Sequence, residues 1–111
     1  MDILLISENR FLDDILLAEL MMKTERVAVI KQNILNNLDI FHQNNNKNLS
    51  NQFSHIVIEA NFFEETVLKK MLEIISLSEC KVIIITTKTY IKKFFDKGKF
   101  VATKEECLKL I

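Results

Sequence analysis

Val82-Ile83-Ile84-Ile85 is one of four short apolar runs in this chain of 111 residues. All four are rich in β-branched residues, apolar without alternation and bounded by polar residues, which favours strands buried on both faces. Strands of this kind occur in parallel sheets that are covered by helices on each side. The other three runs are Ile3-Leu4-Leu5-Ile6, Val27-Ala28-Val29-Ile30 and Ile56-Val57-Ile58, and a weaker fifth candidate is Phe100-Val101-Ala102.

Segments with helical spacing separate these runs. From Phe11 to Met22 apolar residues recur about every third or fourth position, with Ser7 or Asn9 as the expected cap. A shorter pattern covers residues 34–41, and the asparagine-rich stretch at 43–48 is expected to be a loop or a frayed helix end. The apolar positions of the first helix are Phe11, Leu12, Ile15, Leu16, Leu20 and Met22.

The later segments continue the alternation of strand and helix. Asn61 and Glu64 form a capping box, and an apolar stripe follows as far as Ile75. A short helix is expected to end near Gly98, whose freedom at positive φ suits a helix stop, and Thr103 is expected to cap a last helix up to Ile111. Five alternating units without an internal repeat predict one α/β domain over residues 1–111, a three-layer doubly wound parallel sheet.

The composition excludes several classes of function. Gly98 is the only glycine, so neither a phosphate loop nor a dinucleotide-binding turn can form, because both need several residues that are free to take positive φ. Fifteen basic and fifteen acidic side chains cancel, which gives no overall support for binding nucleic acid or an anionic membrane. No cofactor is expected.

Charge is nevertheless unevenly distributed along the chain. Residues 1–80 carry seven basic and twelve acidic side chains, a net charge of −5, whereas residues 81–111 carry eight and three, a net charge of +5. The basic end is either a surface for a partner or simply a solvated face. Nucleic acid is disfavoured as a partner of this domain, since no arginine follows Arg26 and no helix-turn-helix pattern is present.

The two cysteines and the start of the chain bear on its environment. Cys80 and Cys107 form no C-x-x-C motif and have no histidine nearby, which argues against a zinc or redox site and for small core residues in a reducing compartment. The apolar run before Ser7, Ile3 to Ile6, has only four residues, too few for a signal peptide or a membrane span. A cytoplasmic location is therefore expected.

Ligands of open parallel sheets bind beyond the carboxyl ends of the strands. Here those ends present Ser7 and Glu8, then Glu59, then Thr86, and Lys104 after the weak fifth strand. This arrangement resembles the receiver domains of bacterial two-component response regulators over nearly the whole chain. The resemblance implies a flavodoxin-like sheet of order 2-1-3-4-5, an acidic magnesium-binding pair after the first strand, a phospho-accepting aspartate after the third, a Ser or Thr after the fourth and a lysine after the fifth.

The chain departs from that pattern at the positions that carry phosphotransfer. Ser7 replaces the first acid of the pair, and Glu59 replaces the acceptor aspartate, which displaces the carboxylate by a bond length of about 1.5 Å. Loss of a carboxylate weakens magnesium binding, so no metal site is expected beyond weak Mg²⁺ binding at Glu8 and Glu59. Lys104 lacks the proline that follows the family's lysine. Glu59, close to Lys104 or Thr86, is expected to mimic a phosphorylated site.

The expected function is a phosphorylation-independent signalling or regulatory interaction module, not an enzyme. In receivers the face of the fourth helix, fifth strand and fifth helix docks partners or a second copy, and here it would carry Lys88, Tyr90, Lys92, Lys93, Phe94 and Phe95. Three alternatives remain open. Glu8 and Glu59 are ordinary acids facing helix N-termini, Phe94 and Phe95 are core residues, or the chain is a flavodoxin-like ligand-binding domain or enzyme that uses the strand-end cleft.

Overall fold

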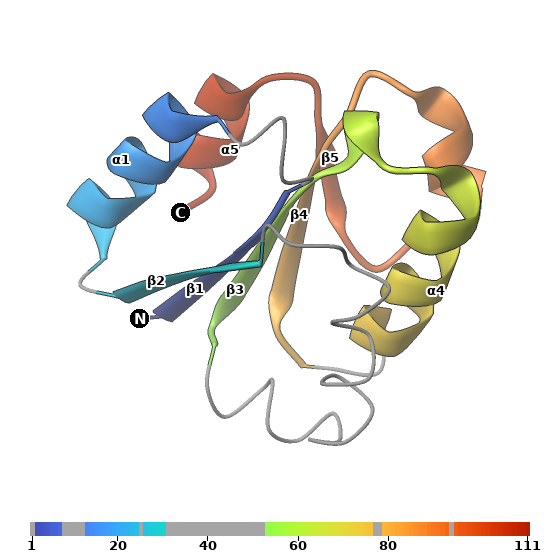
Figure 1. Cartoon of the computed structure of the whole chain (residues 1–111), viewed down its shortest axis with the longest axis horizontal. Helices are drawn as coiled ribbons and strands as arrows, with labels where there is room; N and C mark the ends of the chain where they lie inside the picture. The colour runs from blue at the N-terminus through green and yellow to red at the C-terminus, as the bar shows by residue number, and fades with distance from the viewer. Residues whose placement is uncertain (1, 8–12, 25, 31–52, 77–78, 94) are drawn as a thin grey trace.

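A five-stranded parallel sheet of order β2-β1-β3-β4-β5 forms the centre of the molecule (Figure 1). The computed structural model describes residues 2–7, 13–24, 26–30, 53–76, 79–93 and 95–111. The helix expected at 34–41 and the asparagine-rich stretch lie outside these residues, as do Glu8 and Phe94. The strands are β1 (Asp2–Ile6), β2 (Arg26–Ile30), β3 (His55–Glu59), β4 (Lys81–Ile85) and β5 (Lys99–Val101).

Helices cover both faces of the sheet. Figure 1 shows α1 (Asp14–Lys23) and α5 (Lys104–Lys109) on one side and α4 (Glu65–Ser76) on the other. Two short 3₁₀ helices, η2 (Ala60–Phe62) and η3 (Thr89–Lys93), follow β3 and β4. The predicted three-layer doubly wound α/β fold and its strand order are confirmed.

The continuous apolar runs fill two cores, because successive side chains of a strand point to opposite faces. On one face, Leu4, Ile58 and Ile84 pack against the Leu68–Ile75 stripe of α4. On the other face, Leu5 and Ile83 pack against α1 and against Cys107 of α5. The apolar runs of β1, β3 and β4 therefore have to be continuous, since each strand supplies both cores.

The first helix differs from its prediction at both its cap and its buried face. Asp13 caps α1, because its Oδ1 accepts the N–H groups of Ile15 and Leu16 at 3.0 Å each, so neither Ser7 nor Asn9 is the cap. Leu16 and Leu20 are buried, whereas Ile15 is 62% and Met22 83% exposed. The two exposed residues are seven apart and share a face that is turned away from the sheet.

The helix after β3 also begins later than predicted. Asn61 lies in η2 and does not cap α4, which starts at Glu65. The capping-box spacing is present in the sequence, but the Asn61 side chain instead bonds to the segment after β4. A long-range contact has replaced a local one.

Gly98 is required for a different reason from the predicted one. The preceding helix η3 ends at Lys93, and the φ angle of Gly98 is outside the left-handed region. A Cβ at this position would lie 2.9 Å from Phe95 Cε1 and 3.2 Å from the Val82 carbonyl oxygen. Gly98 thus allows the chain to pass close to β4 and to the buried Phe95 ring before β5 begins.

We expect Gly98→Ala to destabilise the fold by about 1–3 kcal/mol, the usual cost of forcing extra volume into a packed site. Chemical denaturation of the wild type and the variant measures this difference. Phe95→Leu removes the ring atom that the new methyl group would meet, so the double variant should lose less stability than the sum of the two single losses. Strictly additive losses would contradict the close approach.

Candidate functional site

The carboxyl edge of the sheet collects most of the predicted site residues. Because all five strands are parallel, their carboxyl ends meet at one edge, which places Ser7 after β1, Glu59 at the end of β3 and Thr86 after β4. Lys104 opens α5, whose cap is the predicted Thr103. The hydroxyl of Thr103 accepts the N–H of Glu106 at 3.2 Å.

Lys104 pairs with Asp13, a residue that the sequence analysis did not single out. Lys104 Nζ donates to Asp13 Oδ2 at 3.2 Å, and both side chains are 29% exposed. Asp13 therefore caps α1 with one oxygen and binds the first residue of α5 with the other. Burial opposes ionisation of Asp13, but the N–H of Leu16, Lys104 and the N–H of Ile15 together lower its pKa below the usual value.

Glu59 lies beside this ion pair and is half-buried. Its carboxylate accepts hydrogen bonds from the backbone N–H of Asp13 and from the Ser7 hydroxyl. Its Oε1 is buried and has no hydrogen-bond partner among the described residues. Burial raises the pKa of Glu59, with the negative charge of Asp13 adding to the rise, and the two hydrogen bonds and the more distant Lys104 oppose it.

The charge of Glu59 also reaches into the core behind it. Burial, together with the negative charge of Glu59, raises the pKa of the Cys107 thiol to about 11. Cys107 is fully buried on α5 and remains a neutral thiol at physiological pH. It is a core residue, as the sequence predicts, and not a nucleophile.

Thr86 belongs to a second, separate hydrogen-bond cluster. Its hydroxyl donates to Asn61 Oδ1 at 2.9 Å and accepts the N–H of Lys88 at 3.0 Å. The same amide oxygen of Asn61 accepts the N–H of Thr87 at 2.9 Å. Asn61 thereby ties the segment after β3 to the segment after β4.

Ser7 and Glu59 therefore lie together, with Lys104 close by. Asp13 is a further member of this cluster, whereas Thr86 lies outside it. Glu59 is expected from the sequence to lie close to Lys104 or Thr86 as a mimic of a phosphorylated site, but in the structure Lys104 forms its ion pair with Asp13 and Thr86 bonds to Asn61. Glu8 lies outside the described residues. Within the part of the chain that the structure describes, no cluster of three or more His, Cys, Asp or Glu side chains is placed to hold a metal ion.

Only some residues of the predicted interaction face are exposed to solvent. Lys92 and Lys93 are exposed, and Lys88 and Tyr90 are half-buried. Phe95 is 5% exposed and packs edge-on against Phe100, so its assignment to the interaction face is wrong and it is a core residue. Lys92 Nζ lies 5.7 Å from the centre of the Phe100 ring, a cation–π contact that connects the lysines to this core.

The sheet order, the helices on both faces and the polar cluster at the carboxyl edge define an α/β protein with a flavodoxin-like fold. The cluster lies at the ends of β1 and β3, next to the point where the strand order reverses, which is where such folds bind ligands. No protein-family model, curated protein or solved structure matches this chain. Of the helices in the described ranges, none is long and apolar enough to cross a membrane.

The raised pKa of Glu59 predicts a specific dependence of stability on pH. Folding disfavours the charged form of Glu59, so its contribution to stability is greatest below its ordinary pKa and declines as the pH rises through the raised value. Glu59→Gln removes this ionisation and retains an oxygen for the N–H of Asp13. We expect the stability of the variant relative to the wild type to increase between pH 4 and pH 7, measured by urea unfolding.

Asp13→Asn is the companion variant. It removes the neighbouring negative charge and releases Lys104, so the pKa of Glu59 should fall towards its ordinary value, as NMR titration of the glutamate side chain would show. Asp14→Asn, on the exposed face of α1, is the control and should leave this pKa unchanged. A stability difference between wild type and Glu59→Gln that does not vary with pH would contradict the assignment.

Proposed function

We propose that this chain is a phosphorylation-independent regulatory domain that resembles the receiver domains of response regulators and acts through protein contacts in the cytoplasm. The proposal is supported by the contacts that the carboxyl-edge residues make with one another. Lys104 is bound by Asp13, and Glu59 accepts hydrogen bonds from Ser7 and from the backbone of Asp13. Cys80 and Cys107 are not joined in a disulfide, in keeping with a reducing compartment.

Phosphoryl transfer to this site would have to overcome three features. The acceptor position is occupied by a glutamate, whose Oε1 is buried. Lys104, at the position of the family's lysine, already has a carboxylate partner at 3.2 Å. The hydroxyl of Thr86 is engaged with Asn61 and with the backbone of Lys88. In-line attack requires these groups to be aligned around an incoming phosphoryl group, so their internal contacts oppose the reaction.

The same contacts hold α1, α5 and β3 in one arrangement. Asp13 links the starts of the two helices, and its N–H binds the end of β3. The carboxyl groups of Asp13 and Glu59 belong to the unmodified chain, whereas a phosphorylated receiver acquires its added charge only on modification. The proposed module is thus permanently in one state, and its output depends on partner binding alone.

The proposed partner surface is formed by Lys88, Tyr90, Lys92 and Lys93 on and around η3. The ammonium groups of Lys92 and Lys93 are exposed, and the cation–π contact holds Lys92 beside the Phe100 ring. Clustered positive charge of this kind attracts an acidic protein surface and accelerates encounter. The partner is either another protein or a second copy of the chain.

The first test of the proposal is chemical. We expect no mass increase in the intact protein after incubation with acetyl phosphate and Mg²⁺, because the acceptor, the lysine and the hydroxyl are all engaged. A receiver domain with an aspartate acceptor, treated in the same way, is the positive control. A phosphoryl adduct on Glu59, or on any other residue of this chain, would show that the proposal is wrong.

The second test concerns the interaction surface. We expect the double variant Lys92→Glu/Lys93→Glu to weaken self-association or partner binding by about tenfold, since two charges that steer the encounter are reversed. Sedimentation velocity over a range of concentrations measures self-association, and quantitative pull-down of a purified partner measures partner binding. Lys23→Glu/Lys70→Glu, two exposed lysines on other helices, is the charge-matched control. Equal weakening by both pairs would remove η3 as the interface.

A further inference from the structure

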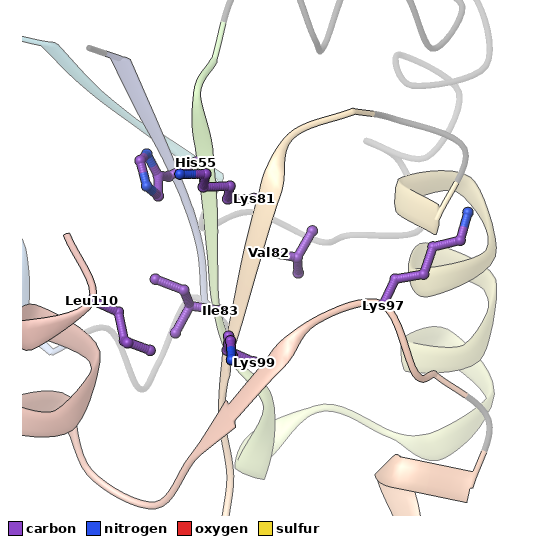
Figure 2. A pocket seen from close by; sticks show the side chains of 7 residues that line it. All are labelled: His55, Lys81, Val82, Ile83, Lys97, Lys99 and Leu110. Atoms are coloured by element: carbon purple, nitrogen blue, oxygen red, sulfur yellow. The ribbon is translucent and has the colours of Figure 1, made fainter.

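A cavity of about 360 Å³ opens at the amino edge of the sheet, the edge opposite the site described above (Figure 2). It lies where β3, β4 and β5 begin, beside the end of α5. A volume of this size is at the small end of the range for small-molecule sites. The lining residues are His55, Lys81, Val82, Ile83, Lys97, Lys99 and Leu110.

The sheet register explains why basic residues gather there. His55 is the register partner of Lys81, and Lys99 is the partner of Ile83 two residues further along β4. Residues in register share a face of a parallel sheet, so these three basic side chains lie on the face whose centre packs against α1 and α5. The helix α5 ends at Lys109, after about 9 Å of length, so that Leu110 forms a wall of the cavity and does not cover it.

The cavity combines positive charge with an apolar floor. Its lining contains three lysines and a histidine and no acidic residue. Lys97 Nζ donates to the Ser76 carbonyl at 2.6 Å, and in Figure 2 its side chain points towards α4, away from His55. Lys81 and Lys99 form no ion pair within the described part of the chain, so two ammonium groups remain to be neutralised beside Ile83 and Leu110.

His55 adds a directed hydrogen-bonding group to this cavity. Its Nδ1 lies 2.8 Å from Ser54 Oγ, whose hydroxyl donates to the Asp2 carbonyl at 3.2 Å, so Nδ1–H is the donor to Ser54. The other ring nitrogen, Nε2, donates to an anion only when the ring is protonated. Burial lowers the pKa of His55, and the positive charge of Lys81 lowers it further. An anion bound beside both side chains would favour the protonated ring, whose Nε2–H would then donate to it.

We propose that this cavity binds a small organic phosphate monoester, with the phosphate between Lys81 and Lys99 and the organic group against Ile83 and Leu110. Two ammonium groups balance a dianion, and lysines act on phosphate as point charges without needing the fixed geometry of arginine. The apolar side chains contribute by removing the organic group from water. This site is separate from the carboxyl edge and does not depend on the function proposed for that edge.

The test is an NMR titration of the full chain with phenyl phosphate. We expect saturable shifts at residues 55, 81–83 and 99, and weaker binding of inorganic phosphate, which lacks the apolar group. Lys81→Gln/Lys99→Gln should weaken phenyl phosphate binding by about tenfold or more, because it removes two charge-assisted hydrogen bonds. These lysines are exposed, and unchanged thermal unfolding would verify that the variant is folded.

Lys23→Gln/Lys70→Gln is the charge-matched control, since both lysines are exposed and lie outside the cavity lining. Equal weakening by the two double variants would show non-specific attraction and overturn the proposal. Shifts confined to the carboxyl edge around Glu59 and Lys104 would overturn it as well, as would the absence of saturation. Equal affinity for inorganic phosphate and phenyl phosphate would overturn the role of Ile83 and Leu110.

Discussion

The contacts of Asp13 hold the carboxyl edge of the sheet and its two neighbouring helices together. One oxygen caps α1, the other binds Lys104 at the start of α5, and the backbone N–H of the same residue binds Glu59 at the end of β3. Three elements from distant parts of the sequence thus meet at one residue. Because Asp13 and Lys104 are each only 29% exposed, their attraction is screened less than that of a fully exposed pair.

The two edges of the sheet carry different groups. Asp13 and Glu59 lie at the carboxyl edge, where the N-termini of α1 and α5 favour negative charge. His55, Lys81 and Lys99 lie at the amino edge. The basic excess of residues 81–111 is distributed over several surfaces, with Lys81 and Lys99 at the amino edge, Lys92 and Lys93 on η3, and Lys104 at the carboxyl edge. The totals of the sequence do not contain this distribution, which follows from the sheet register and the helix positions.

The fold class could be predicted from the sequence because each strand is marked by a short continuous apolar run. Continuous β-branched runs identify strands that are buried on both faces, and strict alternation with helices limits the topology to a parallel sheet. The neighbourhood of Ser7 and Glu59 followed from the rule that parallel strands end at one edge. The resemblance to receiver domains supplied the strand order, which the periodicity of the runs does not contain.

The contacts that could not be predicted from the sequence join residues that are far apart in the chain, in place of the local contacts that each residue could also make. Asp13 and Lys104 are 91 residues apart, and nothing in either neighbourhood marks them as a pair, although the acidic dipeptide Asp13-Asp14 before an apolar helix is a recognisable start signal. Asn61 has the spacing of a capping box, but its amide oxygen binds Thr86 and Thr87 instead. Phe95 is an aromatic residue among lysines in the sequence, and only its packing in the fold, where it is 5% exposed, shows that it is a core residue.

Glu59 and His55 mark the two ends of the same face of β3, about 13 Å apart along the strand. Between them Val57 packs with Ile83 and Val101 beneath the helices. The two ends of this face are therefore separated by a packed apolar layer. A ligand bound at the proposed amino-edge site would therefore lie on the far side of this apolar layer from Asp13 and Glu59, and the two proposed sites share no side chain of β3.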